Sequence, residues 1–162
     1  MSSLKKLKKT DIFIIICAIA CVAGVFAGSL SCRGYKNVSF DFSSGVYFVE
    51  SFVKHIKIPI IIWFFAFLPY AALAAVPLLF FKGFSVGAGV ALILAGGGNI
   101  ISVFFTTGIQ NLILIPAYIF ISRESFDYSG KFRSYIRALL VCIICAAAVA
   151  FYESYLLKRI VL

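Results

Sequence analysis

Long runs of apolar residues, interrupted by short polar or charged segments, make up most of this chain. A helix needs roughly 20 apolar residues to cross the hydrocarbon core of a bilayer. The pattern predicts five spans, at about 12–30, 58–81, 84–98, 100–122 and 138–157, with an outer loop at 31–57 and an inner loop at 123–137. We therefore expect an all-α, polytopic bundle of transmembrane helices that forms one membrane domain over residues 1–162.

Two short segments set the boundaries of the third predicted span. We interpret Lys82-Gly83 as a very tight connection after the second span. The cluster Gly96-Gly97-Gly98-Asn99 is a strong helix-breaking signal. The arm between these two segments is too short to cross a bilayer fully at 1.5 Å per residue. We therefore expect a broken or re-entrant helix near Gly96–Asn99.

Small residues recur at four-residue spacing in three of the predicted helices, and the stripe of the last span is Cys142, Ala146 and Ala150. The third span carries such a stripe at Gly83, Gly87, Ala91 and Ala95. The first span carries another, at Ala20, Gly24 and Gly28, and we expect this span to be retained rather than removed as a leader. Small residues allow membrane helices to approach backbone to backbone. The stripes therefore predict close helix packing.

The outer loop contains a second, weaker periodicity. Apolar residues between Val46 and Ile56 follow helical spacing, while Glu50, Lys54 and His55 fall elsewhere on the wheel. This pattern predicts a short amphipathic helix on the membrane surface, or an ordinary loop that folds back onto the bundle. His55, the only histidine, is interpreted as an interfacial side chain.

Composition agrees with a membrane protein, since 63% of residues are hydrophobic, 13% are charged and the mean hydropathy is +1.08. The net charge of +9 arises from short Lys and Arg clusters beside the apolar spans, which is typical of topology signals rather than of nucleic-acid binding. Nine of these residues fall on the side of the amino terminus and six on the other. The bias predicts a cytoplasmic amino terminus in a multi-pass protein of the cell membrane.

No set of residues in the sequence points to catalysis. Five of the six carboxylates lie in flanks or loops, and Glu153 is expected to reach the membrane surface from the end of its helix. An intramembrane protease would need a Ser–His pair or paired Asp residues at membrane depth. Cys142 and Cys145 have redox-motif spacing, but only apolar neighbours. We therefore predict a non-enzymatic protein with no metal and no cofactor.

An amide pair stands within the fourth span. Gln110 and Asn111 lie five and six residues before Pro116. Unpaired amides are unfavourable in lipid, so both need a partner. One interpretation is hydrogen bonding that fixes the register of the bundle. The other is a polar lining for a solute, in which case the absence of an ionisable residue at depth argues against coupling to ions or protons.

Two motifs resemble the stage II sporulation protein M family of endospore-forming bacteria. They are the Phe81-Lys82-Gly83-Phe84 segment and the run from Gln110 to Ala117. Larger relatives in that family show Pro-His-Gly-apolar-apolar-Glu-apolar-Pro-Ala. Pro116 and Ala117 match that pattern, while its Pro, His, Gly and Glu positions are occupied here by Ile109, Gln110, Asn111 and Leu114.

The resemblance implies a membrane scaffold of the engulfment machinery. Such a protein recruits and holds two peptidoglycan-degrading partners, stage II sporulation proteins D and P, at the sporulation septum. The alternative that the residues leave open is a membrane subunit of a small-solute transporter or channel. The prolines of the second span, the Gly96–Asn99 break and the Gln110-Asn111 pair would then form discontinuous helices around a midplane site.

Overall fold

The computed structural model describes residues 9–32, 48–65, 67, 71–98, 100–126 and 132–156, and the elements within these ranges are helical. They are α1 (Lys9–Ser31), α2 (Phe48–Phe65), α3 (Ala71–Ala95), α4 (Ile100–Val103), the π-helical turn η1 (Phe104–Gly108), α5 (Ile109–Phe126), α6 (Phe132–Phe151) and the π-helical turn η2 (Tyr152–Leu156). The prediction of an all-α helical bundle is confirmed. Most of the predicted outer loop, together with Asn99, residues 127–131 and residue 157, lies outside the described residues.

Four helical stretches are long and apolar enough to cross a membrane. They are Lys9–Ser31, Ala74–Ala95, Ile100–Phe126 and Arg133–Tyr155. At 1.5 Å per residue, the 23 residues of α1 extend over roughly 34 Å, slightly more than the hydrocarbon thickness of a bilayer. The chain is therefore a multi-pass membrane protein by the length and composition of its helices.

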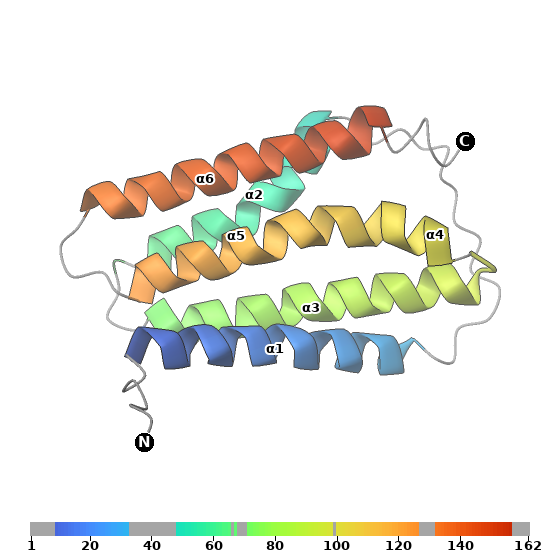
Figure 1. Cartoon of the computed structure of the whole chain (residues 1–162), viewed down its shortest axis with the longest axis horizontal. Helices are drawn as coiled ribbons and strands as arrows, with labels where there is room; N and C mark the ends of the chain where they lie inside the picture. The colour runs from blue at the N-terminus through green and yellow to red at the C-terminus, as the bar shows by residue number, and fades with distance from the viewer. Residues whose placement is uncertain are drawn as a thin grey trace, which may run out of the picture.

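The helices pack side by side in a bundle (Figure 1). α1 and α3 lie together along one edge, α5 occupies the middle, and α2 and α6 cover the opposite side. We call the end where α1 begins the N-face, and the end where α1 stops and η2 lies the C-face. α1, α3 and α6 run from the N-face to the C-face, and α2 and α5 run back.

Contacts between named residues fix these directions. The backbone of Cys21 lies against Gly83 and that of Val25 against Gly87, so α1 and α3 are parallel. The ring of Trp63 stacks on that of Tyr135, with centroids 5.8 Å apart. Trp63 lies near the end of α2 and Tyr135 near the start of α6, so these two helices are antiparallel.

The predicted boundary at Lys82-Gly83 is wrong. Both residues lie near the middle of α3, which continues without interruption from Ala71 to Ala95. Phe67 lies in a turn after α2, so the predicted span 58–81 is divided between α2 and α3. Pro77 lies inside α3, and membrane helices tolerate proline because neighbouring helices and local adjustments of the helix satisfy the backbone group that it frees.

The predicted break in the glycine cluster is present, as the turn that ends α3. Gly97 adopts a positive φ of 83°, a conformation that glycine reaches without a steric penalty. The Gly98 N–H donates to Ile93 O at 2.9 Å and the Gly97 N–H donates to Leu94 O at 3.2 Å, as in a Schellman cap. Because α3 is full length, this turn connects two complete helices and the expected short arm does not exist.

The predicted surface helix is also wrong in its position. The segment is helical, but α2 extends from Phe48 to Phe65 and packs against both α5 and α6. Ser51, His55 and Ile56 are buried, with His55 only 2% exposed. The amphipathic pattern therefore marks a helix with a buried polar face rather than one that rests on a membrane surface.

Two apolar clusters hold the bundle together. One joins α1, α3, α5 and α6 and contains Phe13, Cys17, Ala75, Leu79, Leu114, Tyr118 and Val149. The other lies nearer the N-face between α2, α5 and α6 and contains Ile62, Ala117, Ile121, Ala138 and Cys142. Polar side chains of α2 and η2 are buried nearer the C-face.

Candidate functional site

The contact between α1 and α3 is made by glycines of both helices. A Cβ atom built on Gly83 would overlap the carbonyl oxygen of Cys21, and one on Gly87 would overlap that of Val25. From the other side, a Cβ on Gly24 would lie 2.8 Å from the Phe84 amide nitrogen. Each helix therefore approaches the other at the level of the backbone, where no larger side chain fits.

The stripe of the last predicted span, Cys142, Ala146 and Ala150, is buried throughout, whereas the stripes of α3 and α1 are buried only in part. Ala91 is half-buried and Ala95 is exposed. Gly87 lies opposite Val25, so Ala95, two turns further along α3, lies beyond the end of α1 at Ser31. No residue of α1 therefore covers Ala95, and it is exposed. On α1, Ala20 is half-buried, and the buried line that reaches Gly24 and Gly28 continues instead through Cys17 and Cys21.

Lys82 is an intramembrane side chain rather than part of a loop. It lies half-buried in the middle of α3, and its Nζ atom is 6.0 Å from the centroid of the Tyr118 ring on α5. An amine over an aromatic face is attracted by the quadrupole of the ring. Lys82 also interacts electrostatically with Lys54 and Glu153. The expectation that membrane depth contains no ionisable group is therefore wrong.

The amide pair bonds within its own helical stretch. The Gln110 side-chain nitrogen donates to the Thr106 carbonyl, and Asn111 Nδ2 donates to the Thr107 carbonyl at 2.6 Å. Both acceptors belong to η1, a π-helical turn. Pro116 is exposed on α5, where it removes one backbone donor. The amides therefore satisfy backbone carbonyls of an irregular helix, although Asn111 Oδ1 is buried without a hydrogen-bond partner.

A polar cluster that the sequence did not predict joins α2 to the end of α6. Ser51 Oγ donates a hydrogen bond to Glu153 Oε2, and His55 Nε2 lies 3.1 Å from the same oxygen. The Tyr118 hydroxyl donates to the His55 backbone carbonyl at 2.8 Å. The expected exposures of His55 and Glu153 are both wrong, because their side chains are 2% and 10% exposed. We call Ser51, His55 and Glu153 the α2–η2 cluster.

The local fold explains how this cluster forms. Ser51 and His55 are one helical turn apart, so they share a face of α2. Glu153 lies in η2, and Tyr152 of the same turn donates to Phe105 O of η1 at 2.8 Å. The two π-helical turns therefore contact each other beside the cluster. Ser51 and Glu153 are 102 positions apart, a separation over which helical periodicity gives no signal.

The geometry of the α2–η2 cluster differs from that of a nucleophile–histidine–acid triad. In such a triad the histidine stands between the nucleophile and the carboxylate, and it receives the proton of the nucleophile. Here Ser51 and His55 both approach one oxygen of Glu153. The carboxylate accepts the hydrogen bond of Ser51 and forms a close electrostatic contact with His55, so the arrangement connects two helices and does not increase the basicity of a serine oxygen.

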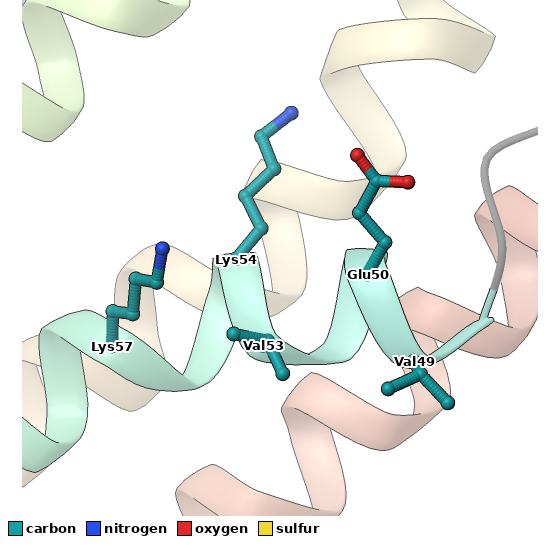
Figure 2. A pocket seen from close by; sticks show the side chains of 5 residues that line it. All are labelled: Val49, Glu50, Val53, Lys54 and Lys57. Carbon is teal, nitrogen blue, oxygen red and sulfur yellow. The ribbon is translucent and has the colours of Figure 1, made fainter.

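A groove with charged walls follows the exposed side of α2. It has a volume of about 550 Å³ and is lined by Val49, Glu50, Val53, Lys54 and Lys57. Figure 2 shows the Glu50, Lys54 and Lys57 side chains projecting from the same side of the helix. We call these three residues the α2 charged strip.

Within the described residues, no group of three or more His, Cys, Asp or Glu side chains is arranged to hold a metal ion. Cys142 donates from its thiol to the Ala117 carbonyl, with an S···O distance of 3.3 Å. It therefore takes part in the contact between α5 and α6.

Comparison with protein-family models, with curated proteins and with solved structures gives no match to this chain.

Proposed function

We propose that this protein is a non-enzymatic membrane scaffold of the sporulation engulfment machinery. In this proposal it recruits and holds peptidoglycan-degrading membrane proteins at the septum, and the partners suggested by the resemblance are stage II sporulation proteins D and P. The resemblance rests on the Lys82-Gly83 segment and on the Gln110 to Ala117 run.

The observation that carries the proposal is the use of the buried polar side chains. Gln110 and Asn111 bond to carbonyls of their own helical stretch. Glu153 holds Ser51 and His55 of another helix. These groups stabilise the bundle, as a rigid platform for partners requires, whereas a solute site would direct such groups into a cavity.

The charge distribution supports a cytoplasmic N-face. Since Lys82 lies within α3, and Lys54 and Lys57 lie within α2, these three lysines are not loop charges. Counted over the loops and the outer two turns of each helix, which include Lys54, the N-face carries eight Lys or Arg residues and the C-face carries five. The positive-inside bias therefore favours an amino terminus in the cytoplasm and a carboxyl terminus outside.

A second candidate function is a membrane subunit of a small-solute transporter. Two observations favour it: the half-buried Lys82 at the middle of α3, and the unpartnered, buried Oδ1 of Asn111. Ionisable side chains at membrane depth often mark a solute or ion pathway. Under this alternative, substitution of Lys82 would abolish solute uptake while the protein still accumulates in the membrane.

The test of the scaffold proposal is deletion of the gene in a spore former whose peptidoglycan hydrolases carry fluorescent labels. We expect membrane migration around the forespore to stop and the hydrolases to disperse from the septum. Normal engulfment with correctly localised hydrolases would refute the scaffold proposal.

A further inference from the structure

α2 is not one of the four stretches apolar enough to cross a membrane, but its Lys54 lies within electrostatic range of Lys82 in the middle of α3, so the α2 charged strip is level with the apolar length of the bundle. Glu50, Lys54 and Lys57 are spaced by four and three residues, so they share one face of the helix, and all three are exposed. Lys54 and Lys57 lie about 9 and 13 Å along the axis from Phe48, at 1.5 Å per residue. Charged groups this far into a bilayer normally face protein, water or a counter-charge.

Among the described residues, Glu50 lies one turn before Lys54 on the same face and Glu153 is within electrostatic range of Lys54, but two lysines and one glutamate leave the strip with a net positive charge. No ion pair joins Lys54 or Lys57 to another described residue, and the nearby Glu153 is already shared by Ser51 and His55. Lys82 adds a further positive charge within electrostatic range of Lys54. The groove is therefore a positively charged surface within the bundle's apolar length.

We propose that this groove docks a membrane-spanning helix of a partner protein that places an Asp or Glu side chain against Lys54 and Lys57. The inference rests on the proposed scaffold function and identifies its docking surface by charge complementarity. Glu50 is the residue of the strip nearest the C-face, and Lys54 and Lys57 lie deeper in the bundle. The acidic residue of the partner helix is therefore two to three turns from the end of that helix at the C-face. Apolar side chains of the partner contact Val49 and Val53.

Two other occupants fit the observations less well. The phosphate of a lipid stays in the headgroup layer, whereas Lys57 lies more than two helical turns from Phe48. A second copy of the chain offers no suitable carboxylate among the described residues. Asp11 and Glu124 lie toward the N-face, Glu50 belongs to the strip itself and Glu153 is engaged in the α2–η2 cluster.

The experiment measures association of the full chain with designed membrane-spanning peptides. The chain, labelled with a donor fluorophore at its carboxyl terminus, is placed in neutral phosphatidylcholine vesicles. Leu/Ala peptides of about 22 residues carry an acceptor and one Glu at the predicted depth, and the matched peptide carries Gln there. We expect the Glu peptide to associate about tenfold more tightly than the Gln peptide, a preference of about 1.4 kcal/mol.

Variants of the strip make the result specific. Lys54→Leu with Lys57→Leu should remove the preference, and Arg137→Leu, an exposed cation on α6, should retain it. The variant with Lys54→Glu and Lys57→Glu should associate more tightly with a peptide that carries Lys at the same depth. This result would show that a protein altered in the strip is folded and still binds.

Either of two results would overturn the docking inference. One is equal association of the wild-type chain with the Glu and Gln peptides. The other is a lipid effect. If added phosphatidylglycerol abolishes the preference for the Glu peptide, and if this lipid is enriched around the wild-type chain but not around the Lys54→Leu, Lys57→Leu variant, the groove is a lipid site. Dispersal of the labelled hydrolases on gene deletion would still support the scaffold function in both cases.

Discussion

Gly87 of α3 lies so close to Val25 of α1 that a Cβ atom at Gly87 would overlap the Val25 carbonyl oxygen. The same overlap arises between Gly83 and Cys21, one turn earlier along both helices. Membrane helices gain little from hydrophobic association with each other, so lost van der Waals contact is not readily recovered. The α1–α3 pair is therefore the contact in the bundle that tolerates the least added volume.

Gly87→Ala should separate α1 from α3 and lower the amount of folded protein in the membrane. The matched control is Gly89→Ala, because a Cβ at Gly89 meets nothing within 4 Å. Alanine favours helix over glycine by about 1 kcal/mol, so the control should be neutral or stabilising. Membrane accumulation and resistance to denaturation by detergent measure the difference. Equal behaviour of the two variants would mean that α1 and α3 do not pack in this way.

Glu153→Gln should weaken the attachment of α2 to the end of α6. The substitution removes the charge that Ser51 and His55 share, and it leaves His55 buried beside a neutral amide. A loss of about 1–3 kcal/mol in the free energy of unfolding is expected for a buried group that loses its partner.

A double-mutant cycle with His55→Gln measures the coupling between His55 and Glu153 directly. The double variant should lose less stability than the sum of the two single variants. Strict additivity would show that the two side chains do not interact. Glu124→Gln serves as a control carboxylate, since its Ser134 partner belongs to a different part of the bundle.

Asn111→Leu should cost only about 0.6–2 kcal/mol of stability, the range for a hydrogen bond between polar groups in a membrane. The reason is that Asn111 Nδ2 bonds to Thr107 O of its own helical stretch, so this hydrogen bond does not join two helices. Thermal unfolding in detergent and the localisation of partner hydrolases are the measurements. A variant that accumulates normally and still localises the hydrolases, yet has lost uptake of a solute, would favour the solute-lining interpretation.

Reporter fusions test the direction in which the chain crosses the membrane. A reporter after Leu162 should be active only outside the cytoplasm, and one within 125–130 only inside, because the N-face flanks carry most of the Lys and Arg. The opposite result at both positions would reverse the proposed orientation.

The sequence predicted the features of this fold that depend on local spacing. Gly83 and Gly87 repeat every four residues, so their shared face and their role in packing follow from helical geometry. Gly97 marks a true turn, since only a residue that tolerates positive φ ends α3 in this way.

The sequence did not predict where helices begin and end within a continuous apolar run. Lys82-Gly83 has the composition of a turn, yet a lysine inside a helix is tolerated when its amine lies over Tyr118 and near Glu153. Pro77 likewise lies inside a helix. The α2–η2 cluster depends on residues from distant parts of the chain, and only tertiary packing brings Glu153 to His55.

The central structural claim is that α1 and α3 run parallel. For two parallel helices to follow each other in the chain, α2, which connects them, must cross the bundle in the opposite direction. The side of the membrane on which Phe67 lies tests the claim most directly, since this exposed residue follows α2 and precedes α3. In an otherwise cysteine-free chain, Phe67→Cys should react with a membrane-impermeant maleimide only from the side that holds the amino terminus. Labelling only from the opposite side would mean that α2 does not cross, and would contradict the parallel packing of Gly87 against Val25.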